Sequence, residues 1–208
     1  MSAYWVTFYS YKGGVGRTLA MVNTAAYLVR TGRSVVLLDF DLEAPGLDGF
    51  DEFNLAKGAP GIVEYVDEYL RTGRAPQINS YVHDPKMEDE GIRGELRIMP
   101  SGKKDEKYNE KRENIDWSAL YEKYDGEMFV KNWKEDIDRT FKPDYVFIDS
   151  RTGLTDVGGI CTLGFPDLVV ALFSLNNQNI NGIAGVIKNI SKAKLNPPQL
   201  LTVATPIP

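Results

Sequence analysis

One stretch near the start of the chain, Ser10–Thr18 (SYKGGVGRT), combines residue types that bind phosphate. It follows an apolar run at 4–9 and precedes a run with helical spacing at 19–30, so we expect a loop between a strand and a helix. Its three glycines allow a tight turn whose backbone N–H groups face one concave side. The N-terminus of the following helix adds unpaired amides and partial positive charge to the same space. The stretch therefore predicts a polyphosphate site.

Thr18 and two cations carry the side-chain chemistry of this loop. Thr18 would place its hydroxyl on a magnesium ion that bridges the outer phosphates. The general pattern G-x-x-x-x-G-K-[ST] has a lysine that reaches the phosphates, and Arg17 stands in its place, with Lys12 at the start of the loop. A glycine-rich turn with two solvated cations is the alternative interpretation, and the flanking strand and helix argue against it. The residues that we expect around the phosphates are Gly13, Gly14, Val15, Gly16, Arg17, Thr18 and Leu19.

Two further segments place carboxylates at the ends of predicted strands. Asp39 and Asp41 follow the apolar run 34–38, and Asp149 ends the run 145–148. Because the carboxyl ends of parallel strands meet at the sheet edge where α/β proteins bind ligands, we expect all three beside the glycine-rich loop. Asp149 would accept hydrogen bonds from waters on the magnesium. An acidic surface loop is the alternative for the first segment, and a buried strand ending in aspartate is by itself a weak signal.

The loop sequence K-G-G-V-G-R-T resembles the deviant Walker A motif of the ParA/MinD (SIMIBI) class of P-loop ATPases, in a KGGVGR variant, and the resemblance covers nearly the whole chain. It implies binding of ATP or ADP with Mg²⁺ and a nucleotide-dependent homodimer. By this match Lys12 would reach across the dimer interface to the partner's nucleotide, and Asp41 would lie near the attacking water. Asp39 would help to hold magnesium through water. Gly153, in a segment that resembles switch II, would let its backbone approach the γ-phosphate.

The resemblance implies slow hydrolysis of ATP to ADP and phosphate, with Lys12, Arg17 and Asp41 as the candidate catalytic residues. A guanidinium is bulkier than an ammonium and planar, so a second hypothesis is a nucleotide-binding regulatory or dimerisation module with little or no hydrolysis. A small-molecule P-loop kinase is a third and weaker alternative, because the sequence shows no obvious acceptor site.

The rest of the chain predicts the scaffold. Continuous apolar runs suit strands of a parallel sheet that is buried on both faces. Further strands are predicted at 34–39, 145–149, 167–173 and 199–206, with a short strand and turn at 95–102 and a short strand around 81–82. Helices are predicted at 61–70, 115–124, 127–141 and 183–193. The charged segment 103–114 predicts a mobile loop or a helix surface. We expect an α/β, doubly wound fold with a mainly parallel sheet and helices on both faces.

Composition limits the class of protein. The chain has 208 residues, 43% of them hydrophobic, which predicts one nucleotide-binding domain over residues 1–208. Because it ends on a core strand, we expect the N-terminal part of a longer protein, with a downstream domain or protein partner. The net charge of −5 argues against a protein whose whole surface coats nucleic acid or anionic lipid. No apolar run reaches the length of a membrane span. A single cysteine, Cys161, fits the reducing cytoplasm, and a single histidine argues against a zinc site.

Overall fold

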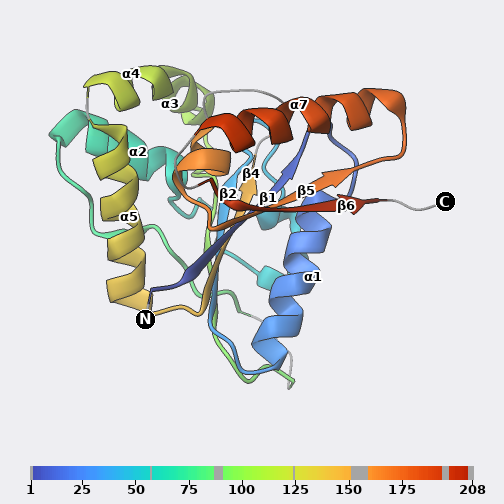
Figure 1. Ribbon diagram of the computed structural model, residues 1–208. Helices are drawn as coiled ribbons and strands as arrows, with labels where there is room; N and C mark the ends of the chain where they lie inside the picture. Colours follow the sequence, from blue (N-terminus) through green and yellow to red (C-terminus); the bar gives the residue numbers. More distant parts are fainter. Residues whose placement is uncertain are drawn as a thin grey trace.

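The computed structural model describes residues 2–56, 58–86, 91–123, 125–150, 159–193 and 197–205. Its centre is a six-stranded sheet in which all neighbouring strands are parallel, in the order β3-β2-β4-β1-β5-β6 (Figure 1). The strands are β1 (Tyr4–Ser10), β2 (Val35–Phe40), β3 (Leu96–Met99), β4 (Tyr145–Ser150), β5 (Leu168–Phe173) and β6 (Gln199–Ala204). The predicted α/β fold, with a parallel sheet and helices on both faces, is confirmed.

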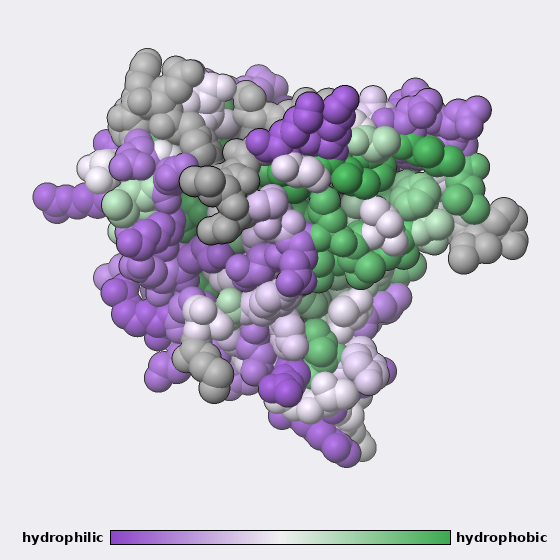
Figure 2. Space-filling view, viewed as in Figure 1, coloured by the Kyte–Doolittle hydropathy of each residue, from purple (hydrophilic) through white to green (hydrophobic). Residues whose placement is uncertain are grey.

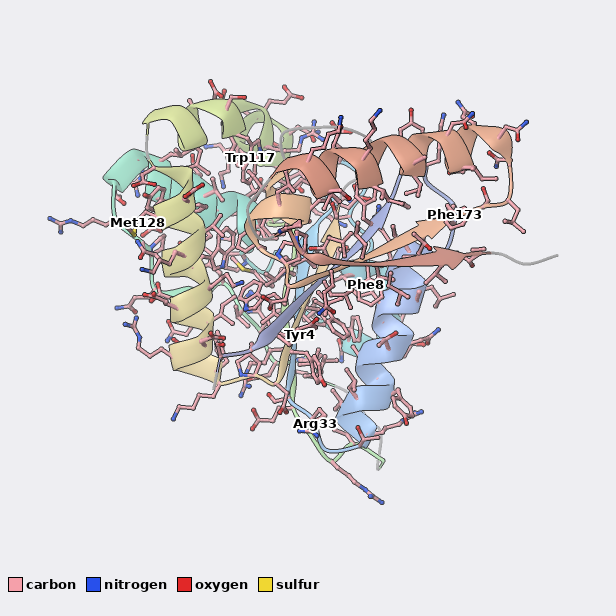
Figure 3. The ribbon with its side chains drawn as sticks, in the orientation of Figure 1. Tyr4, Phe8, Arg33, Trp117, Met128 and Phe173 are labelled. Atoms are coloured by element: carbon pink, nitrogen blue, oxygen red, sulfur yellow. The ribbon has the colours of Figure 1, made fainter. Side chains whose placement is uncertain are left out.

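The helices form two layers around the sheet. They are α1 (Arg17–Arg30), α2 (Ile62–Thr72), α3 (Tyr108–Asn114), α4 (Trp117–Lys123), α5 (Gly126–Phe141) and α7 (Asn177–Ala193). Short helical turns are η1 (Leu47–Gly49), η2 (Asp51–Phe53), η3 (Ile78–Ser80) and η4 (Ile160–Gly164). Helix α1 covers one face, where it shares a core cluster with Phe8 of β1, whereas α2, α5 and α7 cover the other (Figures 1 and 3). None of the helices in the described part of the chain has the length and apolar character to cross a membrane.

The larger core lies between the sheet and α2 and α5. In α5, Phe129, Trp133 and Ile137 are buried at intervals of four residues, with Phe141 packed at the margin, as the sequence predicts. The ring centroids of Trp133 in α5 and Tyr65 in α2 are 4.4 Å apart, so aromatic contacts join the two helices. Every position of β2 is buried, which matches the uninterrupted apolar run that predicts a central strand.

Two local predictions differ from the structure. Helix α7 begins six residues earlier than expected, at Asn177, because the side chain of Asn176 accepts a hydrogen bond from the N–H of Asn179 (2.9 Å) and caps the helix. No strand forms at 81–82, where the chain follows η3 and makes one isolated antiparallel bridge, His83 with Ile98. The charged segment 103–114 contains α3, which agrees with the helix surface as one of its two predicted forms.

Strand order is what assembles the candidate site. Strand β4 lies between β1 and β2, so the carboxyl ends of these three strands are adjacent at one edge of the sheet. The glycine-rich loop leaves β1 at that edge and continues directly into α1. The order of strands reverses around β1, which is where open α/β sheets bind their ligands.

Candidate functional site

The glycine-rich loop has a backbone that only glycine adopts without strain. Gly14 and Gly16 have φ of 79° and 75°, in the left-handed region. Nothing lies within 4 Å of a Cβ built on Gly13, Gly14 or Gly16, so one side of the loop is open. Helix α1 begins at Arg17 without a side-chain cap at Gly16, and its first N–H groups keep their anion-binding capacity. This arrangement fits a phosphate group.

Register places two of the predicted carboxylates side by side. Asp39 of β2 pairs directly with Asp149 of β4, and Asp149 in turn pairs with Phe8 of β1. Both aspartates are fully buried, and Asp41 follows β2 two residues after Asp39. The structure therefore brings Asp39, Asp41 and Asp149 to the edge where the glycine-rich loop begins.

Arg17 contacts two of these carboxylates at once. Its Nε donates a short hydrogen bond to Asp149 Oδ1, and its Nη2 donates to Asp41 Oδ2 at 2.6 Å. Its Nη1 is 3.5 Å from Ser10 Oγ, and only 7% of the residue is exposed. In this structure the guanidinium lies on carboxylates, and its expected contact with phosphate stays a prediction. We refer to Arg17 together with Asp41 and Asp149 as the Arg17 bridge.

Thr18 and Asp39 have different tasks at this edge. Thr18 Oγ1 donates to Asp149 Oδ2 at 2.5 Å. Asp39 accepts hydrogen bonds from the N–H groups of Asp41 (3.2 Å), Gly46 (3.2 Å) and Leu47 (3.1 Å), so it organises the loop after β2. Gly46 packs against Thr18, since a Cβ there would lie 3.3 Å from Thr18 Cγ2.

The donor set fits magnesium only in part. Hydroxyl and carboxylate oxygens, here Thr18 and Asp149, are the ligands that Mg²⁺ takes when phosphate oxygens and waters complete its shell. Among the described residues, no group of three or more acidic, histidine or cysteine side chains is arranged to hold a metal ion alone. The residues present therefore fit a magnesium ion that arrives with a polyphosphate.

The surroundings perturb the ionisation of Asp39, Asp149 and Arg17. Burial raises the pKa of Asp39 to about 8, and the nearby charge of Asp149 acts in the same direction. Burial also raises the pKa of Asp149, although Arg17 and Thr18 oppose the change. The pKa of Arg17 is raised despite its burial, because Asp149 and Asp41 stabilise the guanidinium. Arg17 thus compensates two of the three carboxyl groups, and Asp39 relies on backbone N–H groups.

The other predicted site residues lie around this cluster. Lys12 is exposed and makes no ion pair with a described residue, and Leu19 is exposed on the first turn of α1. Val15 is buried in the core cluster under α1, so its side chain anchors the loop. Gly153 lies outside the described residues.

Sequence reasoning missed Tyr11. The pattern G-x-x-x-x-G-K-[ST] has its first glycine five positions before the second. In this chain that position is Tyr11, which is a second departure from the pattern besides Arg17. The ring of Tyr11 packs against Gly182 of α7, where a Cβ would lie 2.1 Å from Tyr11 Cδ1. Counting back along the pattern would have found the substitution, but not the contact. The first residue of the loop is therefore held against α7.

Comparisons with known proteins agree with this geometry. The CobQ/CobB/MinD/ParA nucleotide-binding domain profile matches residues 6–205. A curated relative, the chromosome-partitioning ATPase Soj of Thermus thermophilus, is 35% identical over 75 residues, which cover 32% of this chain and 30% of Soj. The match thus spans about a third of the length of that relative.

Two solved structures show the same fold. The cell division ATPase MinD of Pyrococcus furiosus aligns with a TM-score of 0.71 and 17% identity, over 97% of this chain and 71% of that one. The septum site-determining protein MinD of Pyrococcus horikoshii, complexed with Mg-ADP, aligns with a TM-score of 0.68 and 18% identity, over 95% and 68%.

Proposed function

The chain belongs to the CobQ/CobB/MinD/ParA family of nucleotide-binding domains, and we propose that it binds ATP with Mg²⁺ and hydrolyses it slowly as the switch of a nucleotide-dependent homodimer. The observation that carries the proposal is the meeting of Arg17 and Thr18 with Asp41 and Asp149 at the sheet edge where the glycine-rich loop opens. Phosphoryl transfer needs mainly positioning and charge compensation, and this edge holds amide donors, a hydroxyl, a cation and carboxylates in mutual contact.

Each residue would have a defined task once nucleotide is bound. The backbone N–H groups of 13–18 and the N-terminus of α1 would hold the β- and γ-phosphate oxygens. Thr18 would bind the metal directly and Asp149 through water, and the metal supplies charge neutralisation. Asp41 would orient the attacking water, whose oxygen bonds to the γ-phosphorus as the bond to the ADP oxygen breaks. Arg17 would compensate the charge that develops on the phosphates.

Dimerisation rests on Lys12. Its side chain is exposed at the mouth of the loop and has no anionic partner among the described residues. A cation in that position suits the phosphates of a nucleotide held by a facing copy. We also propose a cytoplasmic location from the single cysteine, and a longer protein or a partner protein that reads the nucleotide state.

A second function is favoured by the contact between Arg17 and Asp41. Asp41 Oδ2 already accepts a hydrogen bond from the guanidinium at 2.6 Å. The guanidinium therefore competes with a water for this oxygen of Asp41. A nucleotide-binding regulatory or dimerisation module with little or no hydrolysis would result if the guanidinium keeps this contact when ATP binds.

Three measurements on the same protein separate these functions. Calorimetry with ATP and ADP, with and without Mg²⁺, tests nucleotide binding, phosphate release tests hydrolysis, and light scattering tests the dimer. Phosphate release that Asp41→Ala and Lys12→Ala both abolish, with Lys131→Ala on the exposed face of α5 as control, supports the ATPase. Tight binding with release no faster than in buffer supports the regulatory module. Absence of adenine-nucleotide binding rejects both.

A further inference from the structure

The Arg17 bridge joins the ends of two neighbouring strands, β2 and β4. One guanidinium contacts Asp149 at the end of β4 through Nε and Asp41 after β2 through Nη2. Asp149 is fully buried and 13% of the Asp41 side chain is exposed, so water screens these charges weakly. The bridge is therefore a strong local contact at the centre of the site.

The bridge takes the oxygens that a dication would need. Asp39 is occupied by three backbone N–H groups. The carboxylates left for a cation are Asp41 and Asp149, with the Thr18 hydroxyl beside them, and Arg17 already donates a hydrogen bond to each carboxylate. A lysine would hold them less firmly, because an ammonium is a compact point charge, whereas the planar guanidinium presents nitrogens to two carboxylates in fixed geometry.

We propose that Arg17 is a resident counter-ion that keeps Asp41 and Asp149 closed to free divalent cations, so that metal enters only together with a polyphosphate. The inference rests on the proposed function, since it assumes that this edge receives a metal-bound nucleotide. A polyphosphate offers the guanidinium an alternative anionic partner at the adjacent loop. Transfer of Arg17 to phosphate then frees the carboxylates for the metal and its waters.

The test is binding of Mn²⁺ without nucleotide, followed by electron paramagnetic resonance. We expect Arg17→Met to bind one Mn²⁺ at least tenfold more tightly than the wild type, because two carboxylates lose their counter-ion. Arg17→Lys should bind it about threefold more tightly, since a flexible ammonium holds the two carboxylates in a less fixed geometry than the guanidinium. Adding Asp149→Asn to Arg17→Met should return the affinity to the wild-type level.

Two results overturn the proposal: Arg17→Met that binds Mn²⁺ no more tightly than the wild type, or wild type that binds it as tightly as the variant. Circular dichroism and thermal melting report whether Arg17→Met folds. Arg17→Lys keeps a cation at the same position. If Arg17→Met is unfolded, the Mn²⁺ affinity of Arg17→Lys is compared with that of the wild type instead: tighter binding supports the proposal, and equal or weaker binding overturns it.

Nucleotide supplies the second arm of the experiment. In the wild type, ADP should raise the affinity for Mn²⁺ at least tenfold, and in Arg17→Met it should raise it by a smaller factor, because no bridge remains to be opened. An equal factor in both proteins counts against the bridge as the closing element. Failure of ADP to bind at all rejects the proposed function, while the nucleotide-free comparison still judges the counter-ion role of Arg17.

Discussion

The strands β2 and β4 carry an arginine–aspartate contact at each of their two ends, and the two contacts differ in almost every physical respect. At the carboxyl edge, Arg17 is 7% exposed and its partner Asp149 is fully buried. At the amino edge, Arg33 Nη1 lies 3.2 Å from Asp144 Oδ1, with side chains that are 57% and 39% exposed. Figure 3 shows Arg33 at the far end of the molecule from Phe173, which closes β5 at the opposite edge.

The two ion pairs differ in whether water can solvate the partner that remains when the other is removed. Water solvates either partner of the exposed pair if the other is removed, so such pairs contribute about 0–1 kcal/mol. A buried partner left alone keeps an uncompensated charge, and breaking such a pair costs about 3–5 kcal/mol. The same residue types are thus a minor surface contact at one edge and a demanding cluster at the other, which is the edge where the ligand site is proposed.

The largest expected effect comes from making the same substitution at both edges. Arg17→Met should lower the free energy of unfolding by about 3 kcal/mol, because Asp149 and Asp41 lose their counter-ion. Arg33→Met should change it by about 0.5 kcal/mol or less. Urea unfolding of the nucleotide-free proteins at pH 7 measures both. Equal losses at the two edges would falsify the contrast in burial as the cause.

The amino edge is held by close backbone packing, and this can be broken separately. A Cβ on Gly94 would lie 2.0 Å from the carbonyl oxygen of Arg33, so the backbone itself must move. Gly94→Ala should therefore cost about 2 kcal/mol of unfolding free energy. Gly49 is the matched control, because nothing lies within 4 Å of a Cβ there. If both variants unfold at the same urea concentration, the amino edge tolerates displacement and its rigidity is not due to this contact.

The sequence predicts the parts of this contrast that are local. Apolar runs ending in aspartate place Asp39 and Asp149 at strand ends, and the glycines of 13–16 predict the loop between strand and helix. The contact of Arg17 with Asp149 is not a local feature of the sequence. It depends on β4 lying between β1 and β2 and on the register that pairs Asp39 with Asp149. The scaffold is therefore predictable in outline, and the bridge at its centre is not.

The first residue of a helix and the exposure of an edge strand also depend on contacts that the sequence pattern does not show. The start of α7 is set by the amide of Asn176, a competition between a side chain and the backbone that periodicity does not report. Figure 2 shows an apolar area over α7, β5 and β6. Leu201 on the edge strand β6 is 51% exposed. An apolar strand pattern predicts burial there, but β6 has a neighbouring strand on one side only.

The pH dependence of stability tests whether the carboxyl edge is strained by its charges. Burial raises the pKa of Asp39 to about 8 from 3.8, so between about pH 4 and pH 8 the folded protein holds a proton that the unfolded chain has lost. The free energy of unfolding contributed by this group therefore falls as the pH rises through that window. Asp39→Asn keeps an oxygen for the N–H groups of Gly46 and Leu47 without a charge.

We expect Asp39→Asn to gain on the order of 1–2 kcal/mol over the wild type between pH 5 and pH 8. Urea unfolding at both pH values, in chelator and without nucleotide, gives the difference. Parallel pH profiles of the two proteins would mean that Asp39 is already ionised in the folded state at pH 5. Arg33→Met at the other edge should follow the wild-type profile, because it alters no group with a raised pKa near this cluster.

The smallest expected effect concerns the contact of the loop with α7. Gly182→Ala would place its Cβ 2.1 Å from the Tyr11 ring, close to the ring's attachment point, so the first residue of the loop must move. We expect the affinity for ADP to fall three- to tenfold, measured by calorimetry. Gly185→Ala on the same helix meets nothing within 4 Å and should keep the affinity while raising thermal stability slightly. Because Tyr11 stands where the pattern has glycine, equal affinities in the two variants would mean that its ring rests on α7 without positioning the loop, and that the glycines alone shape the cradle at this edge.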